Sequence, residues 1–231
     1  MSEPWLRFRS LFWGSARPLS VGWWAVSACD FPHPLEGFTI PKGSLIRYRE
    51  WYAQKSIGSN EGVKLTAEQI AEGIKERTPE GERIAYTTAN PEIFRSKGGP
   101  SIAERMGKVG VPLMAADDTQ VAKMGPFGGW DAMRARLVGR AGTPAIFCFT
   151  NCQDSIRTIP ALQHDRDHPE EIDGESEIAA AHDWRFACVS RPYSLTVEKK
   201  PEPKQIIVGG KTTVTLNDLW AAHAKRKPTR L

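Results

Sequence analysis

Three groups of residues have types and spacings that could support chemistry. Cys148 and Cys152 lie four residues apart and are followed by His164 and His168, a donor set that zinc sites use. Residues 170–177 (Glu-Glu-Ile-Asp-Gly-Glu-Ser-Glu) are rich in carboxylates that could hold a divalent cation. Residues 209–212 (Gly-Gly-Lys-Thr) match the end of a phosphate-binding P-loop.

Each group also has a structural explanation, which we favour. Cys148 falls in the apolar run 145–149, where cysteine packs as a small hydrophobe. Acidic residues suit the N-terminus of a helix because of its dipole, and a helix is expected from residue 179. A P-loop needs a glycine at position 205, which is glutamine, so residues 209–210 are expected to form a hairpin turn.

Aromatic and basic residues could contact nucleic acid. Trp23, Trp24, Trp51 and Tyr52 could form a base-stacking surface, but aromatic residues on strands are more often part of a core, and we favour the core. The basic end, residues 225–230, could contact phosphates or an acidic partner, or could be only solvated.

The elements that must position these residues follow from the sequence pattern. Residues 5–13, 20–27 and 44–52 have strand composition and are separated by turns, which predicts an antiparallel meander. Thr66 and Gln69 form a capping-box signature at the start of a helix. Helices are expected at 66–77, from Pro91, at 101–107, 130–138, 154–163 and 179–189, and strands at 83–89, 109–115 and 145–149.

This order predicts an α/β fold with a central mixed sheet and helices on both of its faces. We expect one domain over residues 1–194. Residues 195–231 are expected to form an appendage of linker, small hairpin, helix and basic tail. The net charge of +4 is uneven, because residues 199–231 carry +6 and the preceding residues carry −2. The basicity therefore belongs to the tail, and charge alone does not indicate a nucleic-acid-binding domain.

Composition excludes several classes of protein. With 40% hydrophobic and 25% charged residues in 231, the chain is neither disordered nor fibrous. No apolar run approaches the roughly 18 residues of a membrane span, and no secretory signal is recognisable. Four cysteines are too few for a disulfide scaffold, so a reducing, cytoplasmic setting is expected.

Several separate segments together resemble the C-terminal nuclease domain of the large terminase subunit of tailed phages and prophages. The first contains Trp13-Gly14-Ser15, and the segments occur in the same order as in that family, at 13–24, 45–52, 99–106, 129–137, 159–165 and 185–192. The resemblance covers roughly residues 5–193 and implies an RNase H-like fold. There is no Walker A motif, so the resemblance predicts a nuclease-type domain without the ATPase motor.

The resemblance also implies the chemistry of the family, in which a cluster of carboxylates holds two Mg²⁺ or Mn²⁺ ions and the ions cleave DNA. In this chain each of those positions is substituted. Phe12 stands where the family has Asp before Trp-Gly, and Asn90 stands where it has Asp before Pro. Ile178 and His182 fall on the two Asp positions of the Asp-His-Ala-x-Asp pattern.

No catalytic residue can therefore be assigned, and the metal ligands that remain as weak candidates are Asn90, Glu177 and Asp183. Two hypotheses follow. The first is a terminase nuclease-like protein with impaired catalysis that binds double-stranded DNA or packaging proteins such as the portal or the small terminase subunit. The second is an active metal-dependent endonuclease that uses replacement ligands such as Asp173, Glu175 or Asp118 and cuts concatemeric phage DNA. Both place the protein in the cytoplasm of the host cell, away from membranes.

Overall fold

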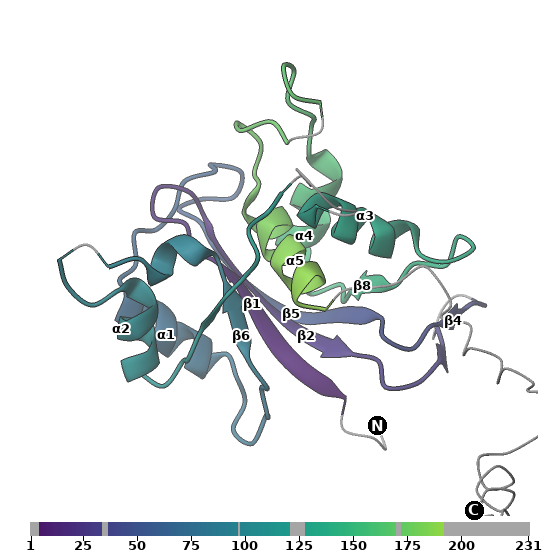
Figure 1. Ribbon diagram of the computed structural model, residues 1–231, viewed down its shortest axis with the longest axis horizontal. Helices are drawn as coiled ribbons and strands as arrows, with labels where there is room; N and C mark the ends of the chain where they lie inside the picture. Colours follow the sequence, from purple (N-terminus) through teal and green to yellow (C-terminus); the bar gives the residue numbers. More distant parts are fainter. Residues whose placement is uncertain (1–4, 34–36, 97, 121–127, 170–171, 192–231) are drawn as a thin grey trace, which may run out of the picture. The chain divides into compact units, whose positions relative to one another are not determined.

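The computed structural model describes residues 5–33, 37–96, 98–120, 128–169 and 172–191 (Figure 1). The chain divides into two units, Met1–Leu195 and Thr196–Leu231. The predicted appendage, with its Gly-Gly-Lys-Thr turn and basic tail, lies outside the described residues. The boundary at residue 194 therefore stays a prediction.

The first unit is built on a six-stranded mixed sheet. Strands β1 (Leu6–Phe12), β2 (Leu19–Val26) and β5 (Leu45–Ala53) pair antiparallel in sequence order, which confirms the predicted meander. Three short strands extend the sheet in parallel: β6 (Thr87–Ala89) beside β1, β7 (Met114–Ala115) beside β6, and β8 (Ile146–Cys148) beside β5. The strand order is β7-β6-β1-β2-β5-β8.

Helices cover both faces of the sheet, as predicted (Figure 1). One face carries α1 (Ala67–Glu76) and α2 (Ile102–Lys108). The other carries α3 (Gly129–Val138), α4 (Gln153–Thr158) and α5 (Ala179–Ser190). The expected capping box at Thr66 and Gln69 begins α1, and Ser101 with Glu104 forms a second one at the start of α2.

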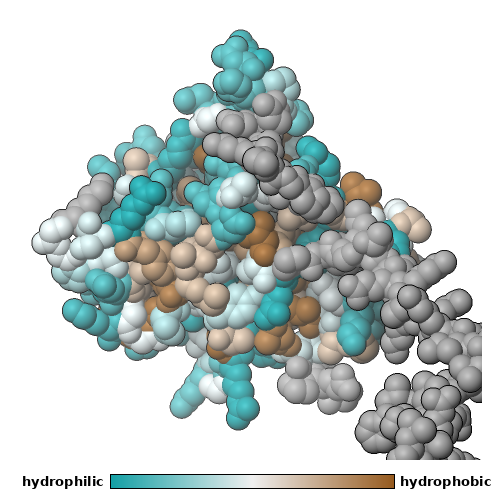
Figure 2. Space-filling view, in the orientation of Figure 1, coloured by the Kyte–Doolittle hydropathy of each residue, from teal (hydrophilic) through white to brown (hydrophobic). Residues whose placement is uncertain are grey.

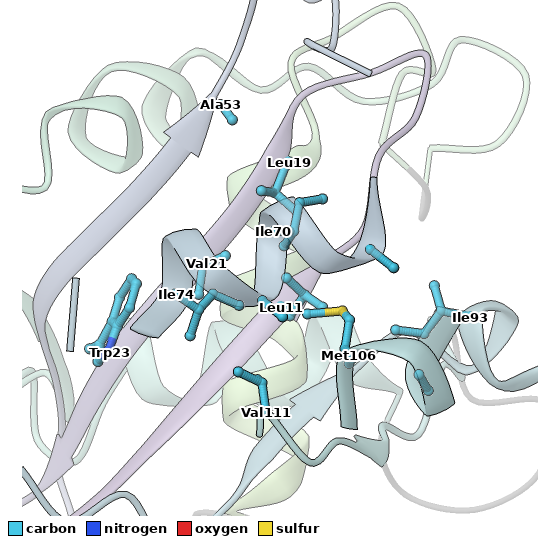
Figure 3. Packing of buried hydrophobic residues seen from close by; sticks show 14 residues of the cluster. Leu11, Leu19, Val21, Trp23, Ala53, Ile70, Ile74, Ile93, Met106 and Val111 are labelled. Atoms are coloured by element: carbon cyan, nitrogen blue, oxygen red, sulfur yellow. The ribbon is translucent and has the colours of Figure 1, made fainter. Parts of the chain in front are cut away.

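The core follows from the periodicity of these elements. Figure 3 shows Ile70 and Ile74 of α1 packed over Leu11 and Val21 of the sheet, with Met106 of α2 beside them. Trp23 and Trp24 are fully buried on opposite faces of β2, which confirms that they belong to the core. Burying such side chains is the main favourable contribution to folding.

Several elements differ from the sequence prediction. Of the strand predicted at 83–89, only β6 is regular, although Ala85 and Tyr86 still hydrogen-bond to β1. Of the strand predicted at 109–115, only β7 is formed, because Pro112 has no N–H to donate to a ladder. The helix predicted at 154–163 leaves α-geometry at Thr158 and continues as a 3₁₀ turn, η2 (Ile159–Ala161), because Pro160 cannot donate the next helical bond.

The sequence prediction also missed a short ribbon, β3 (Phe31–Pro32) and β4 (Thr39–Ile40), within the stretch read as a turn. The run at 145–149, read as buried, is an edge strand whose Phe149 is 55% exposed. In the described part of the chain, no helix has the length and apolar character needed to cross a membrane.

Candidate functional site at the strand ends

The site is the point at which β1 and β6 end side by side. These strands are parallel, and Leu11 lies opposite Ala89. Phe12 and Asn90 therefore follow the two strands side by side, at their C-terminal ends. The side-chain oxygen of Asn90 accepts a hydrogen bond from the Trp13 N–H at 2.9 Å. Helix α5 packs against both strands at this point and stacks the ring of His182 on Phe12, with centroids 5.0 Å apart.

The structure thus brings together Phe12, Asn90 and His182, three of the four positions at which the resemblance implies carboxylates. The fourth, Ile178, is the N-cap of α5, one helical turn before His182. Of the side chains that meet at these strand ends, Phe12 and His182 are rings, and the oxygen of Asn90 is already hydrogen-bonded to the backbone.

Further rings complete what we call the aromatic cluster, formed by Phe12, Trp130, His182 and Phe186. His182 lies 5.2 Å from the ring of Trp130 and 6.3 Å from that of Phe186, which in turn lies 6.5 Å from Phe12. These separations are typical of favourable aromatic pairs. The cluster therefore joins β1, α3 and α5 through apolar contacts.

A buried arginine, Arg185, borders the aromatic cluster. Arg185 is fully buried, and its guanidinium lies 4.7 Å from the ring of Phe186 and 5.2 Å from that of Trp130. Its Nη2 pairs with the carboxylate of Asp118 and also donates to Nδ1 of His182 at 3.1 Å. The aliphatic stem passes so close to Gly129 that a Cβ there would lie 2.8 Å from Arg185 Cδ.

Electrostatics keep His182 uncharged. Burial, and then the positive charge of Arg185, lower the pKa of His182 to about 3. At neutral pH the ring is therefore neutral and can accept the hydrogen bond from Arg185. Burial likewise lowers the pKa of Arg185, against the effect of Asp118.

The acidic residues near the site are engaged by arginines. Glu177 pairs with Arg157 through two bonds of 2.7 and 2.8 Å, and Asp118 pairs with Arg185. Asp183 points away from the aromatic cluster and pairs with Arg47 at 2.6 Å. None of these carboxylates lies in a group with the others.

Asp183 belongs to a second cluster, the buried ionic cluster, formed by Ser20, Arg47, Glu50 and Asp183. Arg47 and Asp183 are fully buried, and the Ser20 hydroxyl donates to Asp183 at 2.8 Å. Arg47 Nε lies 3.4 Å from Glu50. Burial raises the pKa of Asp183 to about 6, opposed by the Arg47 guanidinium, so the carboxylate is charged at neutral pH.

Glu50 links the buried ionic cluster to α4. Its carboxylate accepts from the Asp154 N–H at 2.7 Å and from the Ser155 hydroxyl at 2.7 Å. Cys152, the N-cap residue of α4, makes no side-chain cap, so Glu50 supplies the missing acceptor for the first turn. The role of this cluster is to hold α4 and α5 against the sheet.

The described residues do not fit a two-metal centre. They contain no group of three or more His, Cys, Asp or Glu side chains able to hold a metal ion. Mg²⁺ and Mn²⁺ prefer oxygen ligands, mostly carboxylates, and the strand ends offer aromatic rings and a bonded amide instead. Cys148 and Cys152 are free thiols, and among the described residues they are not grouped with the histidines as a zinc site requires.

Sequence reasoning considered Asp118 only as a possible metal ligand and missed three residues of this region: Trp130, Arg185 and Phe186. Two of them could have been found from helical spacing, because 182, 185 and 186 lie at i, i+3 and i+4 and share one face of α5. Trp130 comes from α3, so its place beside His182, like the pairing of Asp118 with Arg185, required the tertiary structure.

Comparisons with known proteins bear on the fold. No protein-family profile and no curated protein matches the sequence. Among solved structures, the chain is similar to the large terminase of a thermophilic bacteriophage, with 12% identity over 82% of this chain and a TM-score of 0.56. It is also similar to the nuclease domain of the P22 large terminase, with 12% identity over 83% of this chain and a TM-score of 0.52.

These similarities define the class of fold. The chain has the RNase H-like α/β fold of the nuclease domain of phage large terminases, which confirms the fold that the resemblance implied. It covers 84% of the P22 nuclease domain but 41% of the whole large terminase of the thermophilic phage. At 12% identity the similarity concerns the fold, and activity has to be argued from the site.

Proposed function

We propose that the chain is a terminase nuclease-like protein of phage or prophage DNA packaging that has lost two-metal catalysis and acts by binding. The observation that carries this proposal is the aromatic cluster, which fills the strand ends with Phe12, Trp130, His182 and Phe186 in a terminase nuclease fold. The binding partners we propose are double-stranded DNA and packaging proteins such as the portal or the small terminase subunit, in the host cytoplasm.

The physical chemistry supports loss of catalysis. Two divalent ions some 3.5–4 Å apart would need several carboxylates to balance their charge. Of the acids in this region, Glu177, Asp183 and Asp118 are each already paired with an arginine. Freeing Asp118 would leave buried Arg185 without a counter-ion, and freeing Asp183 would remove the closer of the two partners of buried Arg47; both changes are strongly unfavourable.

An exposed arginine, Arg95, that follows the strand ends in the sequence supports a DNA-binding role. Residue Asn90 leads directly into the 3₁₀ turn η1 (Pro91–Phe94), and Arg95 follows it on the surface. No described residue pairs with the Arg95 side chain, so its guanidinium can contact a phosphate. Phosphate contacts of this kind position a protein on DNA without reading its sequence.

The proposal is tested by incubating the purified chain with supercoiled plasmid and excess Mg²⁺ or Mn²⁺, followed by gel analysis of cutting and of retention. We expect no cutting, with retention that decreases as salt rises and weakens in Arg95→Gln. Arg83→Gln, which removes another exposed arginine, is the matched control.

The other results would each change the proposal. Metal-dependent nicking that is lost with EDTA and in Glu177→Ala would instead support an active endonuclease with replacement ligands. If there is neither cutting nor retention, DNA is not the partner, and packaging proteins or a decayed function become the better explanation.

A further inference from the structure

A surface cleft separate from the aromatic cluster suggests a second binding site. The cleft has a volume of about 280 Å³ and lies between the β6–β7 edge of the sheet and the C-terminal end of α5. It combines an apolar lining that includes Met114 and Val189 with polar groups from Tyr86, Asp117, Ser190 and Arg191. Five of its nine lining residues are polar, so the cleft can offer several hydrogen-bonding groups to a ligand.

A chain of hydrogen bonds fixes the cation of the cleft. Arg191 Nε donates to the Tyr86 hydroxyl at 2.9 Å, the Tyr86 hydroxyl lies 3.1 Å from that of Ser190, and Ser190 donates to the Ala187 carbonyl at 2.9 Å. The Arg191 carbonyl is held by Arg136. The guanidinium is therefore preorganised, and within the described residues its two Nη atoms have no hydrogen-bond acceptor. Such a fork suits a carboxylate.

Among the described residues, no strand pairs with the sheet edge beside the cleft. Strand β7 ends the sheet on this side. The Ala116 N–H bonds to the Ala89 carbonyl, and alternate residues of a strand point in opposite directions, so the N–H and C=O of Ala115 point away from β6. Met114 is 51% exposed. Figure 2 shows a pale brown, weakly hydrophobic area on the α2 and β6 side of the molecule, bordered by hydrophilic side chains.

We propose that this cleft and the β7 edge bind an extended peptide segment of a partner protein, with an acidic side chain of the peptide held by Arg191. The peptide backbone would add a strand through Ala115, and its apolar side chains would cover Met114 and Val189. Nucleic acid fits less well, because Arg191 is the one cation among the described lining residues and can pair with one acidic side chain, whereas a nucleic acid carries a negative charge at every phosphate. The site is separate from the aromatic cluster and does not depend on the proposed DNA-binding role.

The test is selection of a displayed library of random heptapeptides on the immobilised full chain, followed by fluorescence polarisation of the enriched peptides. We expect enrichment of Asp or Glu flanked by β-branched or aromatic residues. Affinity should fall at least tenfold in Arg191→Gln and when the peptide acid is replaced by its amide. Arg166→Gln, an exposed arginine outside the cleft, should leave affinity within twofold.

A second pair of variants tests the backbone contact. Ala115→Pro removes the outward N–H and leaves the bonds to β6 in place, so it should abolish peptide binding, whereas Ala115→Val should retain it. Circular dichroism should show both variants folded. The proposal is overturned if no peptide is enriched, if enriched peptides lack an acid, or if they bind Arg191→Gln as well as the unmodified chain.

Two further outcomes would also overturn it by naming another partner. Duplex DNA that binds the chain but not Arg191→Gln, without peptide enrichment, would indicate a nucleic-acid site. Concentration-dependent dimers in sedimentation that are lost in Ala115→Pro would indicate that a second copy of the chain occupies the edge.

Discussion

His182 and Asp183 are neighbours in α5, but their side chains enter opposite surroundings. His182 lies in the aromatic cluster at the strand ends, where burial and Arg185 keep it neutral. Asp183 lies in the buried ionic cluster, where Arg47 and Ser20 surround a charged carboxylate. The chain therefore keeps a buried charge where the sheet supplies partners, and it has rings where the nuclease fold would need unpaired carboxylates to bind metal.

The difference between the two clusters shows how a structural carboxylate differs from a catalytic one. The ionic cluster ties α4 and α5 to β2 and β5, and each of its charges has an opposite charge beside it inside the protein. A catalytic carboxylate must instead remain available to a metal. Asp183, Glu177 and Asp118 thus lie in this region but are each engaged by an arginine.

The largest effect should come from breaking the ionic cluster. Arg47→Met removes the counter-ion of Asp183 and leaves both it and Glu50 without their shared cation. Removing one partner of a buried pair costs about 3–5 kcal/mol. Urea unfolding at pH 7 should show a loss of this size, or no folded state.

The double variant Arg47→Met/Asp183→Leu is its control. It removes both charges together, so it should be considerably more stable than Arg47→Met alone. If the single and double variants are equally unstable, the loss comes from packing, and the electrostatic account of this cluster is wrong.

The next effect concerns the pH dependence of the aromatic cluster. The pKa of His182 is about 3 in the folded chain against 6.5 unfolded, so its contribution to stability is complete above pH 6.5 and is lost as the pH falls toward 3. Relative to the unmodified chain, His182→Gln should gain stability as the pH falls from 6.5 to 4.5, on the order of 1 kcal/mol per pH unit. Urea titrations of both proteins at several pH values measure this difference.

Asp183 works in the opposite direction. Its pKa is raised from 3.8 to about 6, so its unfavourable contribution is present above pH 6 and is relieved as the pH falls to 3.8. In the unmodified chain the contributions of His182 and Asp183 to the pH dependence of stability oppose each other in this range. In His182→Gln the contribution of Asp183 should remain and become visible. A pH dependence identical in the two proteins would show that His182 is not buried in its neutral form.

Two glycines allow the packing of the clusters to be compared directly. A Cβ at Gly22 would lie 2.1 Å from Arg47 Nη1 and 2.6 Å from Trp24 Nε1, and one at Gly129 would lie 2.8 Å from both Arg185 Cδ and the Thr119 carbonyl. Overpacking of this kind costs about 1–3 kcal/mol. In thermal unfolding we expect Gly22→Ala to be the more damaging, since the atoms it meets are closer and fully buried; the reverse order would contradict the account.

The smallest effect should be at the surface. Arg157 and Glu177 pair at 2.7 Å, but their side chains are 35% and 18% exposed. Arg157→Gln should therefore lower the free energy of unfolding by about 1 kcal/mol or less. It should also leave DNA uncut, because freeing Glu177 alone does not create a metal site; nicking in this variant would show that Glu177 is a usable ligand.

The parts of the fold that were predicted correctly from the sequence depend on short local patterns of residues. The capping box at Thr66 and the strand composition of the first three strands are determined within a few residues, and both predictions are confirmed. The matched segments placed Phe12, Asn90 and His182 at one site. The ionic cluster could not be predicted from the sequence. An arginine in a strand, such as Arg47, is normally expected to face solvent, and its partner Asp183 lies 136 residues later in the chain.

The central claim is that the strand ends hold no divalent metal, and Mn²⁺ binding tests it most directly. In an electron paramagnetic resonance titration of the purified chain at neutral pH, the signal of free Mn²⁺ should rise in proportion to the metal added from the first addition. A loss of one or two equivalents of signal that is reversed in Glu177→Ala or Asp118→Asn would contradict the account and restore a metal centre to this fold.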